Sequence, residues 1–321
     1  MSRAGVQLTI DDERDILFDA DKPFSMVYEE LYLAAMRRNR SKGMKEPQVK
    51  GVIADMVRRQ LRPNDFHRRL MTTSGCRHVL TTNYDYNLEE ACTGQLDPVE
   101  RVPFVNETVH SLFRRHEVPL KEGSDDKVSV WHLHGEAMKP STMLLGYEHY
   151  ASYLNKVRGY VVDGLAYQSL PPEYNGTLRP LVRRVAKQTK QSGTSTTSTI
   201  KPLIYSAQHT YPLDVISWVD LFFSTDLYIL GHGMDMVELH LWWLFVFRAR
   251  TKISGNKLRI ENTITYLTPS FLATTEPERR KCALLRSYDV HVHQVQVPPN
   301  DWHAFYDQAL EHLRASRPTP T

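Results

Sequence analysis

"HVLTTNYDYNLEEA", residues 78–91, joins a short apolar run to a segment whose apolar residues have helical spacing. Polar and aromatic residues stand at the junction, from Thr81 to Asp85. Short buried strands between helices are typical of a mostly parallel sheet that helices cover on both faces. Ligands in such folds bind beyond the carboxyl ends of the strands. The stretch therefore predicts an α/β fold with a candidate site where this strand ends.

Further strands are predicted by similar apolar runs at residues 127–135, 226–233, 262–270 and 289–297. The last run alternates polar and apolar residues, which favours an edge position with one wetter face. Helical spacing predicts helices over 23–39, 47–60, 64–74 and 300–315, with Asn64 capping the third and Asn300 or Asp301 capping the last. We expect one Rossmann-like α/β domain over residues 1–320, with a mostly parallel sheet, helices on both faces, and a small helical and low-complexity insertion at 151–205.

Composition restricts the class of protein. Of the 321 residues, 41% are hydrophobic and 24% charged, which are ordinary values for a globular protein, and a formal charge of +3 is too small to indicate nucleic-acid binding by itself. The three cysteines include no CxxC pair, so neither a disulfide framework nor a four-cysteine zinc site is expected. No apolar run reaches the ~20 residues that cross a bilayer, and the first residues lack the core of a signal peptide. We therefore expect a cytoplasmic protein that does not enter a membrane.

Three predicted strand ends carry polar residues of interest: Thr81 to Asp85, His132 to Glu136, and Gly231 to Glu238. Each also has an ordinary structural explanation. The first segment can cap a helix, a histidine beside a strand end can be a packing residue, and Gly-His-Gly at 231–233 can be a tight turn. Their combination is more informative, because ligands bind where the carboxyl ends of such strands lie.

The three segments, in this order, resemble the SIR2-like family, a sirtuin-related fold that consumes NAD and is found in many bacterial defence proteins. "TTNYDYNLEEA" is similar to the family's Thr-x-Asn-Tyr-Asp segment, "WHLHG" to its His-Gly segment, and "LGHGMDMVELHLWWLF" to its later glycine turn and helix, over roughly residues 60–310. The resemblance implies that Asn83 and His134 hold the catalytic positions. It also implies cofactor contacts from Thr82, Asn83, Tyr84, Asp85, Gly135, Gly231, His232, Gly233 and Glu238.

The reaction implied by the resemblance is hydrolysis of NAD+ to nicotinamide and ADP-ribose, with NAD as substrate and no metal. The leaving group is already cationic, so the reaction needs a stabilised oxocarbenium-like transition state and a placed water rather than a strong acid. Asn83 can hydrogen-bond a ribose hydroxyl or orient the water, and Asp85 can carry negative charge near the developing cation. His134 can accept a proton at neutral pH. Many relatives of this kind are abortive-infection effectors, so the resemblance also implies an antiphage role.

The sequence departs from the family pattern in two places. The family's glycine-rich phosphate loop has no counterpart, and its nearest trace is "RAG" at residues 3–5. The paired cysteines of the deacylating sirtuins' zinc module are also missing, so protein deacetylation is not expected. The first departure keeps a second function open, a catalytically degenerate assembly or scaffold subunit. Because some SIR2-like proteins act beside a HerA-type ATPase or form rings and filaments, the resemblance implies a homo-oligomer with such an ATPase, or another co-encoded defence protein, as candidate partner.

Two other classes of function stay open. The pairs His132/His134 and His291/His293 lie on predicted strands, where side chains two apart share a face, and such pairs bind metal in hydrolases. Alternating histidines on an edge strand are also commonly a solvated face. Basic runs at 37–45 and 179–187 keep a nucleic-acid-binding or nuclease function open, although runs this short are commonly solvated helix faces.

Overall fold

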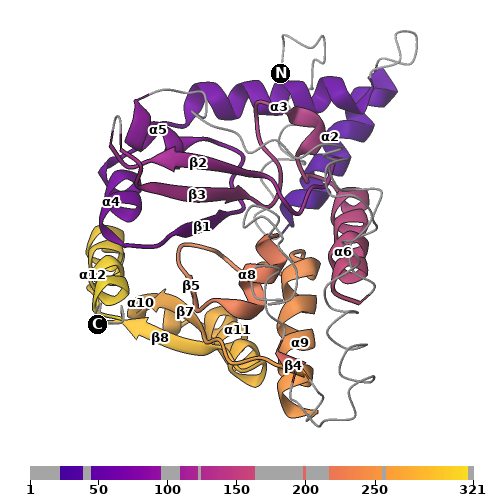
Figure 1. Cartoon of the computed structure of the whole chain (residues 1–321). Coiled ribbons are helices and arrows are strands. Elements are labelled where there is room, and N and C mark those ends of the chain that lie inside the picture. The colour runs from indigo at the N-terminus through magenta and orange to yellow at the C-terminus, as the bar shows by residue number, and fades with distance from the viewer. Residues whose placement is uncertain are drawn as a thin grey trace, which may run out of the picture.

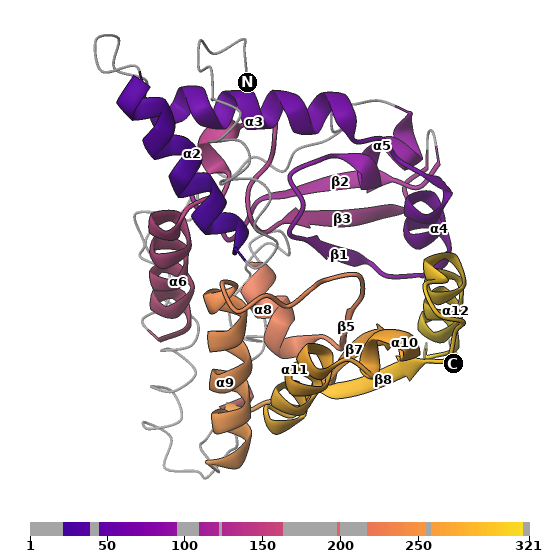
Figure 2. The ribbon, with the colours of Figure 1, turned by 180° about the vertical axis from the view of Figure 1, so that it is seen from behind.

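Two three-stranded sheets form the body of the fold, and Figures 1 and 2 show them one above the other. The computed structural model describes residues 22–38, 45–94, 109–121, 124–162, 198–199, 217–254 and 258–316. The first sheet has the strand order β1-β3-β2 and the second β5-β7-β8, while β4 and β6 form a third, two-stranded sheet. The strands are β1 (His78–Thr81), β2 (Arg115–Pro119), β3 (Lys127–His132), β4 (Ser198–Thr199), β5 (Leu227–Ile229), β6 (Leu258–Arg259), β7 (Ile264–Pro269) and β8 (His291–Val295).

Helices surround both sheets (Figure 2). They are α2 (Phe24–Arg38), α3 (Glu46–Gln60), α4 (Asp65–Thr73), α5 (Asn87–Thr93), α6 (Tyr147–Val162), α8 (Trp218–Ser224), α9 (Leu239–Ile253), α10 (Ser270–Ala273), α11 (Glu276–Ser287) and α12 (Trp302–Ala315), together with the 3₁₀ turn η2 (Pro140–Thr142). The predicted caps are confirmed at two helices. Asn64 Oδ1 accepts a hydrogen bond from the His67 N–H at the start of α4, and Asp301 Oδ1 accepts one from the Ala304 N–H at the start of α12.

The predicted α/β fold is confirmed, with a difference in how its strands are grouped. β1 is parallel to β3, and β7 is parallel to both β5 and β8. β8 lies at an edge of its sheet, as its alternating pattern predicted. β2 was not predicted, and it runs antiparallel to β3 with His116 opposite Val130. The parallel strands therefore lie in two small sheets rather than in one continuous sheet.

β1 and β5 are the edges by which the two sheets face each other (Figure 1). They belong to different sheets, so their backbones do not form a common ladder. Strands inside an α/β sheet are normally buried on both faces, but every residue of β1 and of β5 is only partly buried. The fold therefore leaves space between these two strands.

α4 and α12 join the two halves of the fold along one side of this space (Figure 1). Arg69 Nη1 on α4 donates to Asp307 Oδ1 on α12 at 2.6 Å. Beside this ion pair, the rings of Phe66 and Tyr306 have centroids 4.5 Å apart. Charged and aromatic contacts thus fix the separation of the sheets at the amino end of β1.

The largest hydrophobic core lies among α6, α8 and α9. Trp218 on α8 is buried and donates from Nε1 to the hydroxyl of the buried Tyr153 on α6 at 2.8 Å. The aromatic run of α9 contributes to the same core, since Trp242, Leu244 and Phe245 are buried. The segment "HLWWLFVF" is therefore largely core, in line with its helical spacing.

Several predicted features fall partly or wholly outside the described residues. They are the "RAG" trace at 3–5, residues 39–44 of the first basic run, all of the second basic run at 179–187, and most of the predicted insertion at 151–205. Residues 151–162 of that insertion are the second part of α6. Among the helices that the structure describes, none combines the length and the apolar character that a membrane span requires.

Candidate active site

The turn after β1 is held by its own side chains. Thr81 Oγ1 accepts a hydrogen bond from the Asn83 N–H at 3.1 Å, and Asp85 Oδ1 accepts one from the Asn87 N–H at 3.0 Å. Such side-chain bonds to the N–H two residues ahead stabilise turns that lead into a helix. Asn83 is left exposed between these two bonds. Threonine and aspartate therefore shape this turn, while the carboxamide of Asn83 is available to a ligand.

The loop after β3 is tied to the turn after β1. The Leu133 N–H donates to the Thr81 carbonyl oxygen at 2.9 Å, and the Ala137 N–H donates to the Tyr84 carbonyl oxygen at 2.8 Å. Gly135 lies in the left-handed region with φ +92°, and a Cβ there would lie 2.2 Å from the Thr142 carbonyl oxygen. A side chain at position 135 is thus excluded by both backbone conformation and space. The two strand ends form one rigid unit.

The turn after β5 also needs a glycine. Gly231 has φ +68°, and a Cβ there would lie 3.1 Å from the Tyr306 hydroxyl. His232 Nδ1 accepts a hydrogen bond from the Met234 N–H at 3.0 Å, so the neutral imidazole carries its proton on Nε2. Burial lowers the pKa of His232, against the opposing charge of Glu238. His232 is therefore a neutral hydrogen-bond donor at neutral pH.

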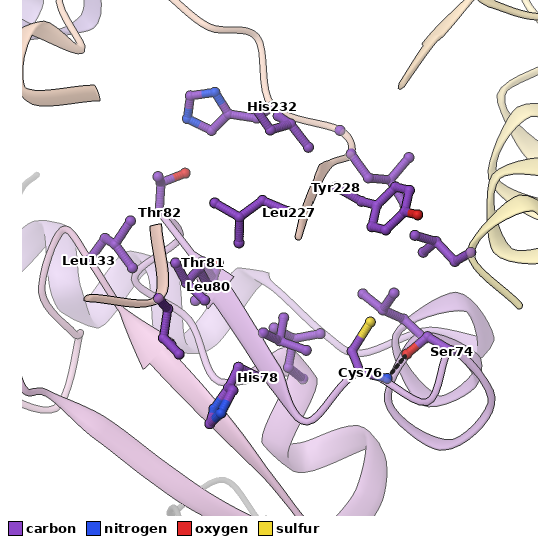
Figure 3. A pocket seen from close by; sticks show the side chains of 18 of the residues that line it. Ser74, Cys76, His78, Leu80, Thr81, Thr82, Leu133, Leu227, Tyr228 and His232 are labelled. Carbon is purple, nitrogen blue, oxygen red and sulfur yellow. Dashed lines mark hydrogen bonds between the residues drawn. The ribbon is translucent and has the colours of Figure 1, made fainter. Parts of the chain in front are cut away.

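A cavity of about 920 Å³ lies between β1 and β5. Figure 3 shows Thr82 and Leu80 on its β1 side, and Leu227 and His232 on its β5 side. Its volume is within the range of small-molecule sites. Of the residues predicted to contact a cofactor, five line this cavity: Thr82, Asn83, Asp85, Gly231 and His232.

The other predicted site residues lie beside the cavity rather than in its wall. They are Tyr84, His134, Gly135, Gly233 and Glu238, none of which is among the lining residues. His134 is 2% exposed, although its neighbour Leu133 lines the cavity. The Tyr84 hydroxyl donates to the Leu144 carbonyl oxygen, and the Gly233 carbonyl oxygen accepts from Lys281 Nζ at 2.9 Å. The structure therefore brings Asn83 to the cavity but places His134 behind its wall.

His134 belongs to a buried cluster with Glu238 and His240. Its Nε2 atom lies 3.1 Å from Glu238 Oε2 and 3.2 Å from His240 Nε2. The ring of Tyr150 packs edge-on against His134, with centroids 5.6 Å apart. Burial lowers the pKa of His240 well below its ordinary value, and the positive form of His134 opposes its protonation further. Sequence reasoning missed His240, although its position two residues after Glu238 was a usable signal.

A second buried network lies under the same loops and contains His132. His132 Nε2 lies 2.8 Å from Glu89 Oε1, and His116 Nε2 lies 2.8 Å from Glu136 Oε2. Burial lowers the pKa of His132, but Glu89 outweighs this effect and holds it above the ordinary value. His132 and His134 thus have different partners, since His134 lies in the turn beyond the end of β3. The two histidines therefore do not form the shared metal pair that the sequence left open.

The second pair that the sequence left open as metal ligands, His291/His293, lies on the edge strand β8. Both histidines are exposed, and His293 stacks on His312 with ring centroids 4.1 Å apart. Among the described residues, neither belongs to a group of three or more metal-ligating side chains. The pair therefore lies on a solvated face of an edge strand, which is one of the two explanations that the sequence allowed.

The cavity offers neutral hydrogen-bonding groups at the carboxyl ends of β1 and β5, with Asp85 as the acidic group beside Asn83. Among the described lining residues, Arg77 alone carries a permanent positive charge, and it precedes β1 at the opposite end of the strand. Hydroxyl and amide groups suit a sugar, and Asp85 suits a developing positive charge. The arrangement is suited to binding a glycoside rather than to holding a phosphate by ion pairs.

These features define an α/β protein with a ligand cavity at the carboxyl ends of its strands. Residues 77–186, about a third of the chain, match the family model of the SIR2-like domain. This segment is similar to a SIR2-like domain, as its motifs predicted, and the match includes Asn83 and His134 but not the turn after β5. No curated protein and no solved structure matched the chain. The SIR2-like domain is consistent with an NAD-using activity at the level of the family.

Proposed function

We propose that the protein hydrolyses NAD+ to nicotinamide and ADP-ribose. The observation that carries the proposal is the cavity between β1 and β5, where Thr82, Asn83 and His232 converge from two different sheets. These are neutral groups that can hold a ribose, and Thr82 and Asn83 lie in the segment that matches the SIR2-like domain. The cavity's volume of about 920 Å³ is sufficient for a nucleotide fragment.

In the proposed reaction the bond between the nicotinamide nitrogen and ribose C1′ breaks, and a water oxygen bonds to C1′. Nicotinamide leaves as a neutral molecule because the electron pair of the broken bond cancels its positive charge. The carboxamide of Asn83 orients the water or a ribose hydroxyl, and the carboxylate of Asp85 stabilises the positive charge that develops on the ribose. His232 donates from Nε2 to a substrate oxygen. His134, buried behind Leu133, is the proposed acceptor of the proton that the water loses.

The test measures nicotinamide release from NAD+ by the wild type, Asn83→Ala and His134→Ala, alone and with a co-encoded partner. We expect each variant to lose about 100-fold or more, since removing one positioned polar group or one proton acceptor commonly costs this much. His293→Ala, an exposed histidine on β8, is the matched control and should keep the wild-type rate. Equal rates in all four proteins would refute the mechanism.

We extend the proposal to antiphage defence, in which NAD+ hydrolysis during infection stops phage production. Cells that express the wild type should reduce phage plating, and cells that express Asn83→Ala should not. Protection that persists in Asn83→Ala would separate defence from NAD+ hydrolysis.

One observation favours a second candidate, a non-catalytic assembly subunit. The permanent cation of the described cavity wall, Arg77, lies at the amino end of β1, whereas a pyrophosphate is expected near the carboxyl ends of the strands. This candidate proposes a homo-oligomer that acts beside a HerA-type ATPase or another co-encoded protein. Absence of nicotinamide release under every condition, together with a stable oligomer or complex in sedimentation, would favour it over the hydrolase.

A further inference from the structure

Three ligand atoms converge beside the cavity, in the cluster of His134, Glu238 and His240. Both imidazoles present Nε2, and the two nitrogens are 3.2 Å apart. Glu238 Oε2 lies 3.1 Å from the nitrogen of His134 and 3.9 Å from that of His240. The three residues are 2%, 8% and 0% exposed, respectively. They come from the turn after β3 and from the start of α9, two segments far apart in the sequence.

Hydrogen bonds alone do not satisfy this cluster. Each Nε2 carries either one proton or one lone pair, so His134 can make one full hydrogen bond here, to His240 or to Glu238. Glu238 Oε2 is buried without a well-directed hydrogen bond, and so is His240 Nδ1. A buried carboxylate oxygen in this state costs free energy unless a cation faces it. The three atoms are therefore better placed to share one positive centre than to bond in pairs.

The separations fit a metal ion. Nitrogen and oxygen ligands lie about 2.0–2.2 Å from Zn²⁺, so two ligands at a tetrahedral angle are about 3.3–3.5 Å apart. The observed separations of 3.1, 3.2 and 3.9 Å bracket this value. Two histidines and one glutamate form a known ligand set of catalytic zinc sites, which leaves the fourth position for water or substrate. We propose that His134, Glu238 and His240 bind one divalent transition-metal ion, with Zn²⁺ as the best fit.

The neighbouring buried network is not proposed as a metal site. There His132 already has Glu89 at 2.8 Å, and His116 already has Glu136 at 2.8 Å. Arg114 Nε, 3.5 Å from Glu136 Oε1, supplies further positive charge. Each imidazole has its own carboxylate, so this network is balanced by ion pairs. In the proposed metal cluster one carboxylate faces two imidazoles.

The metal site goes beyond the proposed hydrolysis of NAD+ and does not depend on it. A bound metal ion occupies the lone pair of His134 that the proposed hydrolase uses for proton transfer, so the metal-loaded chain should not hydrolyse NAD+ and the metal-free chain should. The two proposals are tested by different measurements. Metal content tests the site whether or not NAD+ is hydrolysed, and nicotinamide release after chelation tests whether His134 acts as a free base.

The experiment measures metal in the full chain, purified without chelators and without a histidine tag. Elemental analysis follows dialysis against Zn²⁺ and then against metal-free buffer, and a parallel sample loaded with Co²⁺ is examined for the visible absorption of tetrahedral Co²⁺. We expect about one Zn²⁺ per chain in the wild type and in the control His293→Ala. Glu238→Gln should bind at least about tenfold more weakly, and His240→Ala should retain less than about 0.1 equivalent.

His240→Gln is added because His240 is fully buried and its truncation can unfold the chain. Circular dichroism identifies the variant that remains folded, and that variant is used for the comparison. Less than about 0.1 Zn²⁺ per wild-type chain after loading would overturn the proposal, since a site of this type retains its metal. Equal metal content in the wild type and the folded His240 variant would overturn it as well.

Discussion

Glu136 provides a quantitative test of the buried network under the candidate site. Its Oε2 atom accepts hydrogen bonds from His116 Nε2 at 2.8 Å and from the Tyr86 hydroxyl at 3.0 Å, and its side chain is 3% exposed. Burial raises the pKa of Glu136, but the hydrogen bond and charge of His116, with the charges of His132 and Arg114, lower it more. The result is a pKa of about 2, against an ordinary value of 4.5.

This pKa difference predicts a pH-dependent contribution to stability. Because the folded-state pKa of Glu136 is depressed, its ionised form stabilises the fold above pH 4.5, and this stabilisation is lost as the pH falls towards 2. At about 1.36 kcal/mol for each pKa unit, the contribution is about 3 kcal/mol at pH 7 and about 2 kcal/mol at pH 3.5. The substitution Glu136→Gln removes this ionisable group while preserving its size.

Urea denaturation at the two pH values measures the effect. We expect the free energy of unfolding of Glu136→Gln to be about 3 kcal/mol below that of the wild type at pH 7, and this difference to shrink by about 1 kcal/mol at pH 3.5. Glu311→Gln is the control, because Glu311 is 67% exposed and its ion pair with Arg314 should contribute less than about 1 kcal/mol. A Glu136→Gln difference that is equal at both pH values would refute the reasoning.

Replacing each of three glycines by alanine should change the free energy of unfolding by a different amount, which thermal and urea unfolding can measure. Gly135→Ala should cost more than about 3 kcal/mol, because its φ is +92° and the new Cβ would lie 2.2 Å from the Thr142 carbonyl oxygen. Gly231→Ala should cost about 1–2 kcal/mol, since its φ is +68° but the nearest atom, the Tyr306 hydroxyl, is 3.1 Å away and can move. Gly159→Ala should stabilise the chain by up to about 1 kcal/mol, because position 159 is inside α6 with nothing within 4 Å of a Cβ. A different order of the three free energies would contradict the backbone assignments.

Much of the fold could be predicted because its signals are local. The strands at 264–269 and 291–295 are short apolar or alternating runs between polar residues, and α4 begins at the predicted Asn64 cap. β2 had no such signal, since "RHEVP" contains two charged residues and a histidine. Its pairing with β3 and the partners of its side chains, such as Glu136 for His116, make it a strand. Tertiary contacts of this kind are not visible in a single sequence.

The sequence was sufficient to predict which strand ends form the candidate site, but not which of its side chains are buried. The position of Asn83 in the cavity wall follows from the end of β1, which the sequence shows. The burial of His134 does not, because it depends on α9 bringing Glu238 and His240 against the turn after β3. The division of the strands into two sheets was also not predictable, because strand periodicity does not specify which strands are neighbours.

The space between β1 and β5 has a consequence for backbone amide exchange. Each strand turns one row of its peptide groups towards the cavity instead of towards a neighbouring strand. A molecule held there covers both rows at once, whereas a molecule on the outside of either sheet covers one row at most. Hydrogen–deuterium exchange should therefore record occupancy as simultaneous slowing at the N–H groups of Leu80 and Tyr228, which lie in two segments distant in the chain. A ligand in the cavity would thus contact both sheets directly, whereas without it the contacts between α4 and α12 connect them from one side.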